Sequence, residues 1–180
     1  ALKTLFKILL KNIGFYLKIF MQTPEDLIAA SYFRYQCLKP LIDHQGISDN
    51  FILRNQYRAG ANSKEQGEQS TLEFYNNIEN SDYILCARGA GNFSARLYET
   101  LAMGRIPIYI NTDGLLPLQD KIDWKKHLVW VEKDEISIIA EKVIAFHHNL
   151  NQLKLNQLFK SNRDLWVNKL QMKPFFENHK

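Results

Sequence analysis

The second half of the chain alternates compact apolar runs with segments of helical periodicity. Each run is apolar throughout, which is typical of strands that are buried on both faces of a sheet. The strand candidates are YILCA (83–87), IPIYI (106–110), a run within HLVWVE (127–132) and the shorter FILR (51–54). The chain is therefore expected to contribute several short strands to one sheet.

Apolar residues spaced by three or four positions predict helices around these strands. One helix is expected to begin at Thr23, with Pro24 at its first position, and to stop before Pro40. Another is expected to be capped by Asp134, and the polar stretch 60–69 to be a surface loop. The remaining predicted helices are 1–21, 70–80, 95–103 and 152–170.

Strands that alternate with helices predict a parallel sheet with helices on both faces. The expected fold class is therefore α/β, a Rossmann-like domain. We divide the chain into a basic helix (1–21), a helical connector (22–50), the sheet-containing domain (51–150) and a C-terminal helix with a tail (151–180).

Residues 1–21 form a distinct basic segment. Lys3, Lys7, Lys11 and Lys18 share one narrow face of the predicted helix, and the rest of its circumference is mostly apolar. Such a helix is able to lie in the interface of an anionic membrane. The alternative is a helix that packs on another part of the protein and exposes its lysines to water. The pattern leaves both open.

The charge of the chain limits its partners. The 180 residues include 23 basic and 19 acidic side chains, a net charge of +4. Setting aside the four lysines of 1–21 leaves 19 basic against 19 acidic residues, so the remainder is neutral and a nucleic-acid binder is disfavoured. An aromatic content of 12% disfavours intrinsic disorder. Two cysteines, Cys37 and Cys86, do not make a disulfide scaffold or a metal site.

The richest candidate site is the loop RGAGNFS (88–94), between a predicted strand and the helix 95–103. Ligands of such sheets bind beyond the carboxyl ends of the strands, where loops lead into helices. Gly89 and Gly91 let the backbone approach a ligand closely. The N-terminus of the helix suits a phosphate, because its first N–H groups and its dipole both favour an anion.

Three charged side chains accompany this loop. Arg88 and Arg96 are suited to charge-assisted hydrogen bonds with a diphosphate, and Glu99 is placed to accept bonds from ribose hydroxyls. The alternative is that Arg96 and Glu99 form an exposed ion pair. The loop lacks the third glycine of the dinucleotide fingerprint, and Ile110 stands where that motif has an acid. The residues indicate a nucleotide pocket that is not of the dinucleotide type.

An ordered set of residues extends from Ser81 to Trp124. A serine opens a strand, and then come a glycine loop, Ser-x-Arg-Leu with an acidic residue, Gly-x-Ile-Pro, a Leu-Pro pair and Asp-Trp. In this order and spacing the segment resembles the exostosin family, glycosyltransferase family 47, in its bacterial-type members. Arg105 stands where many members have Cys, and Ile108 replaces Val. The matching residues are Ser81, Gly89, Ser94, Arg96, Leu97, Glu99, Gly104, Ile106, Pro107, Leu116, Pro117, Asp123 and Trp124.

The resemblance implies the carboxyl-terminal, donor-binding half of a GT-B enzyme. Such an enzyme transfers sugar from a nucleotide-diphosphate sugar with inversion. The resemblance places Arg96 on the diphosphate and Glu99 on the ribose. Arg58 is a candidate for contact with a phosphate, and the alternative is a solvated surface arginine. Asp113 is a candidate for contact with the donor sugar, and the alternative is a plain Asp-Gly turn without a function. The expected donor-binding residues are Arg58, Arg88, Gly89, Gly91, Asn92, Ser94, Arg96 and Glu99.

The resemblance leaves the catalytic base outside this chain, because GT-B enzymes usually take it from the amino-terminal, acceptor-binding domain. Cations, backbone N–H groups and a helix dipole suffice to stabilise the departing nucleotide, so no metal or cofactor is expected. The expected partners are a nucleotide sugar, a cell-surface glycan or lipid-linked acceptor and an anionic membrane surface.

The expected location is cytoplasmic, peripheral on the inner membrane face through the helix 1–21. No stretch reaches the roughly 18 apolar residues of a transmembrane helix. Two other classes of function stay open. One is a non-catalytic nucleotide-binding module or partner subunit. The other is a dinucleotide-dependent oxidoreductase half, which the missing third glycine disfavours.

Overall fold

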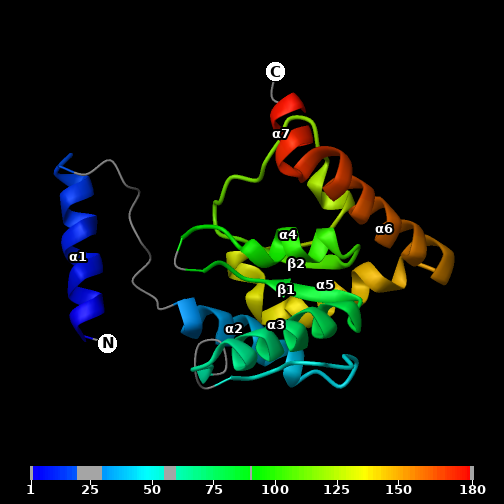
Figure 1. The fold of residues 1–180 in the computed structure, drawn as a ribbon, viewed down its shortest axis with the longest axis horizontal. Helices are drawn as coiled ribbons and strands as arrows, with labels where there is room; N and C mark the ends of the chain where they lie inside the picture. The colour runs from blue at the N-terminus through cyan, green and yellow to red at the C-terminus, as the bar shows by residue number, and fades with distance from the viewer. Residues whose placement is uncertain (1, 20–29, 55–59, 90, 179–180) are drawn as a thin grey trace.

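The computed structural model describes residues 2–19, 30–54, 60–89 and 91–178. Its strands and helices form an α/β arrangement (Figure 1). The η segments are short 3-10 helices, except for the π-helical η4. In chain order the elements are α1 (Leu2–Tyr16), α2 (Ala30–Ile42), α3 (Lys64–Glu79), β1 (Tyr83–Cys86), α4 (Ala95–Ala102), β2 (Ile106–Asn111), η2 (Trp124–Lys126), β3 (Val129–Glu132), η3 (Lys133–Ile138), α5 (Ile139–His148), α6 (Gln152–Leu165), η4 (Trp166–Leu170) and α7 (Met172–Asn178).

The three strands form one parallel sheet in the order β1-β2-β3. Leu85 of β1 lies beside Ile108 of β2, which lies beside Val129 of β3. Parallel neighbours need a crossover, and α4 supplies the one between β1 and β2. The three strand predictions in the second half of the chain and the Rossmann-like α/β class are confirmed.

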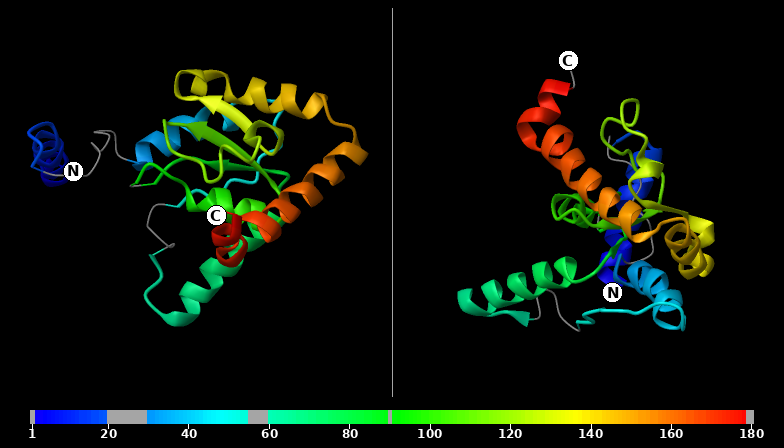
Figure 2. Two further views of the ribbon diagram at one scale, coloured as in Figure 1. Left: turned by 90° about the horizontal axis from the view of Figure 1, so that it is seen from above. Right: turned by 90° about the vertical axis from the view of Figure 1, so that its right-hand side faces the viewer.

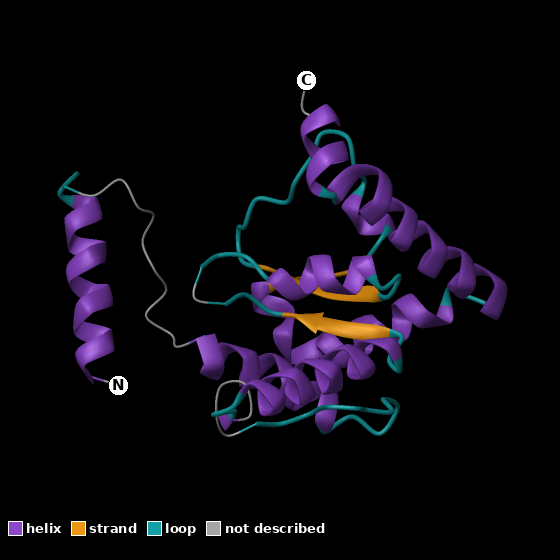
Figure 3. Ribbon diagram, in the orientation of Figure 1, coloured by secondary structure: helices purple, strands orange, loops and turns teal. Residues whose placement is uncertain are grey.

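Successive side chains of the strands point to two hydrophobic cores, one on each face of the sheet. α2 and α5 cover the face on which Leu85 and Ile108 are buried. α4, α6 and the segment after β2 cover the other face, which buries Cys86 and Tyr109. Figure 3 shows the strands lying between these layers of helix. Burial on both faces is the reason that the strands are apolar throughout.

The prediction of a strand at 51–54 is wrong. These residues have no regular secondary structure, and no strand of the described chain pairs with them. Phe51 packs against the core under α2, whereas Ile52 and Leu53 are exposed. Arg54 is bound to α3, where it donates to the Ser70 hydroxyl at 2.8 Å and pairs with Glu73. An apolar run without a neighbouring strand gains no ladder bonds, so its pattern alone does not make it a strand.

Two helix boundaries also differ from the predictions. α3 begins at Lys64 rather than at residue 70, because Ser63 caps it by accepting a hydrogen bond from the N–H of Gln66. Most of the predicted loop 60–69 is therefore the exposed first turns of a helix. α2 continues past Pro40 to Ile42, and the burial of Leu41 in the core favours this last turn despite the proline. Thr23 and Pro24 lie outside the described residues.

The C-terminal third departs from the predictions in its details. Glu132, not Asp134, caps the turn after β3, because its side chain and that of Glu135 form a reciprocal capping box. The predicted helix 152–170 is α6 followed by the π-helical η4, and α7 comes after it. Asn162 of α6 is fully buried and donates to the C=O groups of Arg105 and His127, which ties α6 to the sheet.

α1 lies apart from the sheet and its helices in Figure 1 and in the left view of Figure 2. The predicted basic helix is confirmed over Leu2–Tyr16. Its apolar side chains from Phe6 onward are mostly exposed. Among the described residues, no helix has both the length and the apolar composition to cross a bilayer.

Candidate functional site

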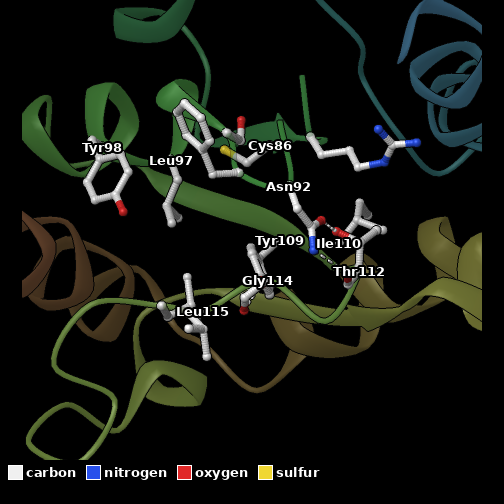
Figure 4. Close-up of a pocket in the computed structure, with 13 residues that line it drawn as sticks. Cys86, Asn92, Leu97, Tyr98, Tyr109, Ile110, Thr112, Gly114 and Leu115 are labelled. Carbon is white, nitrogen blue, oxygen red and sulfur yellow. Dashed lines mark hydrogen bonds between the residues drawn. The ribbon is translucent and has the colours of Figure 1, made fainter. Parts of the chain in front are cut away.

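The glycine loop 88–94 and the segment that follows β2 meet at the carboxyl edge of the sheet (Figure 4). Two hydrogen bonds join them. The Asn92 amide donates to the C=O of Thr112 at 2.7 Å, and the Thr112 hydroxyl donates to Asn92 Oδ1 at 2.6 Å. Close by, a Cβ on Gly114 would lie 2.6 Å from the Asn92 carbonyl oxygen, so only glycine permits this approach. The glycine loop is thus held in place by the segment that follows β2.

Gly89 and Gly91 differ from Gly114 in what a side chain would meet. Gly89 has no positive φ, so its backbone does not require glycine. A Cβ on Gly89 would meet nothing closer than the Phe93 carbonyl oxygen at 3.9 Å, an ordinary contact. A Cβ on Gly91 would meet only the Phe93 ring, at 3.2 Å. The contact at Gly91 is tight, so the Phe93 ring would have to shift. At Gly89 the fold does not need glycine, and the missing side chain leaves the loop backbone open to a ligand.

The helix that follows the loop begins without a side-chain cap. Ser94 has the extended backbone of an N-cap, but its hydroxyl accepts no hydrogen bond from the first turn of α4. The first backbone N–H groups and the positive end of the dipole are therefore left to interact with an anion. The loop itself is closed by the N–H of Gly89, which donates to the C=O of Phe93 at 3.0 Å.

Arg88 is a buried cation at the start of this loop. Only 7% of its surface is exposed, and its guanidinium lies 5.2 Å from the centre of the Phe33 ring of α2. It also donates to the C=O of Gly89 at 3.3 Å. A buried guanidinium has little surrounding water to screen it, so an anion at this edge interacts with it strongly.

Arg96 lies on the α3 side of α4. Its guanidinium is 5.1 Å from the centre of the Phe74 ring, and burial lowers its pKa. Two further cations, Arg34 of α2 and Arg54, lower that pKa as well. Glu99 raises the pKa of Arg96, and Arg54 is itself paired with Glu73, so Arg96 and Arg34 supply the positive charge of this flank, which favours an anionic ligand. Within the described residues, no ion pair joins Arg96 to Glu99, so the alternative of a simple surface pair is not observed.

The acidic residues at this edge are held by local hydrogen bonds. Asp113 has a φ of 59°, and its N–H donates to Asn111 Oδ1 at 3.1 Å in an Asx turn. Glu132 accepts hydrogen bonds from the Trp130 indole at 2.6 Å and the Asn111 amide at 2.7 Å, and these bonds lower its pKa. Both oxygens of Glu132 are occupied, so this carboxylate is a poor proton acceptor.

The pocket between the two segments is small, about 20 Å³, which is room for one water molecule. Small-molecule sites usually measure about 300–1,000 Å³. A nucleotide would therefore lie across this edge rather than inside the pocket. Phe93 and Leu115, with 63% and 86% of their surfaces exposed, border it and are large apolar side chains without cover.

The structure brings part of the predicted set together. Arg88, Asn92 and Ser94 line the small pocket. Arg96 instead lines a larger cavity beside β1, and Glu99 is a half-buried residue in the middle of α4. Arg58 lies outside the described residues.

Sequence reasoning missed Thr112, Gly114 and Arg34. Thr112 and Gly114 directly follow a predicted strand, so their place at the carboxyl edge was the available signal. Arg34 had no such signal, because α2 reaches the site only through packing. The described residues contain no group of three or more His, Cys, Asp or Glu side chains that is able to hold a metal.

A parallel sheet covered on both faces, a glycine loop leading into an uncapped helix and arginines beside it define a Rossmann-like α/β domain with an anion-suited edge. The exostosin GT47 domain matches residues 18–144, and the chain belongs to this family of glycosyltransferases.

Curated relatives agree with this assignment. The probable glucuronosyltransferase 47 A of Physcomitrium patens is 32% identical over 75 residues, 42% of this chain and 17% of that protein. Exostosin-1 of Drosophila melanogaster is 28% identical over 98 residues, 50% of this chain and 13% of that protein. The exostosin-1 homolog of Caenorhabditis elegans is 33% identical over 76 residues, 42% of this chain and 20% of that protein. The chain thus spans a fifth or less of these relatives.

Proposed function

We propose that this chain is the carboxyl-terminal, donor-binding part of a GT-B glycosyltransferase. It binds a nucleotide-diphosphate sugar, whose sugar is transferred with inversion to a cell-surface glycan or lipid-linked acceptor. The observation that carries this proposal is the glycine loop 88–94. Gly89 of this loop is not needed by the fold, and the loop leads into a helix whose N-terminus has no side-chain cap. Membership of a glycosyltransferase family supports it.

The loop and its arginines bind the diphosphate. Backbone N–H groups between Gly89 and Ser94 approach the phosphate oxygens, and Arg88 supplies a charge that water screens little. Arg96 is the second residue of α4, so its charge adds to the positive end of the helix dipole. Glu99 accepts hydrogen bonds from the ribose hydroxyls, and Arg58, which lies outside the described residues, adds a phosphate contact.

These groups act on the leaving group. In an inverting transfer the acceptor hydroxyl attacks the anomeric carbon, the bond from that carbon to the diphosphate oxygen breaks, and a base takes the hydroxyl proton. The negative charge that develops on the diphosphate is stabilised by the loop, the helix N-terminus and the arginines. We place the base on the acceptor-binding domain, outside this chain.

Isothermal calorimetry of the chain tests this function. The ligands are nucleoside diphosphates, their glucuronate, hexose and N-acetylhexosamine esters, and NAD. Binding of a nucleoside diphosphate and its sugar ester supports the proposal, and preference for NAD overturns it. A non-catalytic nucleotide-binding module or partner subunit is the second candidate, because no base is assigned in the described chain. Sugar transfer by the longer polypeptide, measured with a labelled donor, distinguishes the two.

We further propose that α1 attaches the enzyme peripherally to the anionic, cytoplasmic face of a membrane. Lys7, Lys11 and Lys18 are exposed, and so are the apolar Phe6 and Leu10. The described part of α1 contains no acidic residue. A helix with exposed apolar and basic side chains gains both apolar burial and charge attraction at an anionic surface.

A further inference from the structure

A cavity of about 620 Å³ lies beside β1, apart from the small pocket at the glycine loop. Its walls come from α2, α3, α5, the segment 46–51 and β1 itself, and Arg96 of α4 also lines it. Leu41 and Val143 make the wall formed by α2 and α5 apolar. Asn77 of α3 and Asn80, the C-cap of that helix, make the opposite wall polar. The cavity is therefore a slot between two layers of helix, with a strand edge as its floor.

The backbone groups of β1 alternate between its two edges. The N–H of Ile106 donates to the C=O of Asp82 at 3.0 Å, so the backbone groups of Asp82 and of every second residue after it face β2. The N–H and C=O groups of Tyr83 and Leu85 therefore face the other edge. Both residues line the cavity, and no strand of the described chain pairs with them there.

This edge lacks the features that protect natural edge strands. Such strands usually carry charges, prolines or bulges that prevent further pairing. β1 reads YILC, and Ile84, Leu85 and Cys86 are buried. Backbone polar groups in buried surroundings are nearly always hydrogen-bonded. The edge therefore has the character of an interior strand that lacks one neighbour.

We propose that an extended apolar segment of the same polypeptide, from outside residues 1–180, fills the cavity as a fourth strand parallel to β1. The region aligned here covers a fifth or less of the relatives, so proteins of this kind have ample further chain. Parallel pairing follows from the helices on both faces, the usual setting of parallel strands. The segment directs apolar side chains to Leu41 and Val143 and small or polar ones to Asn77 and Asn80.

Amide exchange measured residue by residue with NMR tests this proposal. In the 180-residue chain we expect the amides of Tyr83 and Leu85 to exchange about 10- to 100-fold faster than those of Ile84 and Cys86, which face β2 and serve as internal controls. In the longer polypeptide that contains this chain we expect all four amides to be protected alike. The readout does not involve nucleotide binding, so it is independent of the proposed donor site.

Three results would overturn the proposal. Equally fast exchange of the two outer amides in both polypeptides would show that nothing pairs with this edge. Protection that rises with protein concentration in the 180-residue chain would assign the edge to a second copy. Protection already present in the dilute 180-residue chain, and removed by Leu53→Pro, would assign it to residues 51–54.

Discussion

Asn92 and Thr112, twenty residues apart in the sequence, clamp the glycine loop to the end of β2 with two hydrogen bonds in opposite directions. One uses the Thr112 backbone and the other its hydroxyl. A side-chain change at Thr112 therefore removes one bond and leaves the other acceptor in place.

Thr112→Val, which keeps the shape of the side chain, is expected to lower the free energy of unfolding by about 1 kcal/mol and to weaken nucleoside diphosphate binding. The reason is that the loop is held by one bond fewer, so ordering it for the ligand costs more. Thermal denaturation and calorimetry measure the two effects. Thr71→Val is the control, because its hydroxyl bonds only within exposed α3. Unchanged affinity of Thr112→Val for the nucleoside diphosphate would show that the hydrogen bonds between Asn92 and Thr112 do not contribute to ligand binding.

Gly89→Ala is expected to leave stability nearly unchanged and to weaken diphosphate binding. A methyl group at this position meets only an ordinary contact in the fold, yet it blocks close approach of a ligand to the backbone. Gly114→Ala is the contrasting variant, since its Cβ meets the Asn92 carbonyl oxygen at 2.6 Å, and it is expected to destabilise the fold. Denaturation midpoints and calorimetric affinities separate the two. A well-folded Gly89→Ala protein with full affinity contradicts the ligand role of this glycine.

Arg96→Ala is expected to weaken binding of both nucleoside diphosphate and inorganic pyrophosphate, by about tenfold or more, because a charge-assisted bond to phosphate is lost. Glu99→Ala is expected to weaken only the nucleoside diphosphate, since its proposed contact is with the ribose. Calorimetry with the two ligands makes this comparison. Lys154→Ala, an exposed change on α6, is the control. Loss of pyrophosphate binding in Glu99→Ala would refute the ribose assignment.

Stability is expected to fall as the pH rises from about 9 to about 12. Burial raises the pKa of the Cys37 and Cys86 thiols from 9.0 to about 12. Both thiols stay protonated in the folded state over this window, whereas they ionise in the unfolded state, which binds fewer protons. Their contribution is present in full below pH 9 and is lost as the pH rises through the folded-state pKa. Urea denaturation at each pH measures the slope, and a slope unchanged in Cys86→Ala would contradict the assignment of this thiol.

Deletion of residues 1–19 is expected to reduce flotation of the protein with vesicles that contain anionic lipid. Lys7→Glu with Lys11→Glu is expected to have the same effect while leaving the exposed apolar side chains in place. Raised salt should weaken binding of the intact chain, because the attraction is partly electrostatic. Equal flotation of the intact and shortened proteins would show that α1 does not bind the membrane, which leaves the alternative of a helix that packs on another part of the protein.

The sequence by itself predicted the elements whose local pattern and burial agree. The strands β1, β2 and β3 and the helix α4 lie where apolar runs, periodicity and Gly104 put them. The glycine loop was also predictable, because it is a continuous segment between a strand and a helix. The boundaries of α2 and α3 were not, since the packing of Leu41 and the Ser63 cap outweighed the signals of Pro40 and of a polar stretch.

Pairing and proximity were decided only by the tertiary structure. Local pattern predicted a strand at 51–54, yet a strand needs a neighbouring strand, and no strand of the described chain pairs with these residues. Contacts between distant segments leave no local pattern in the sequence. The hydrogen bonds between Asn92 and Thr112, the contact of Arg88 with the Phe33 ring and the open edge of β1 were therefore not predicted. The sequence determined which segments prefer strand, helix or loop, because those preferences are local. Which segments meet depends on packing between residues far apart in the chain. That packing determined the positions of Arg34 and Arg88 and formed the cavity beside β1.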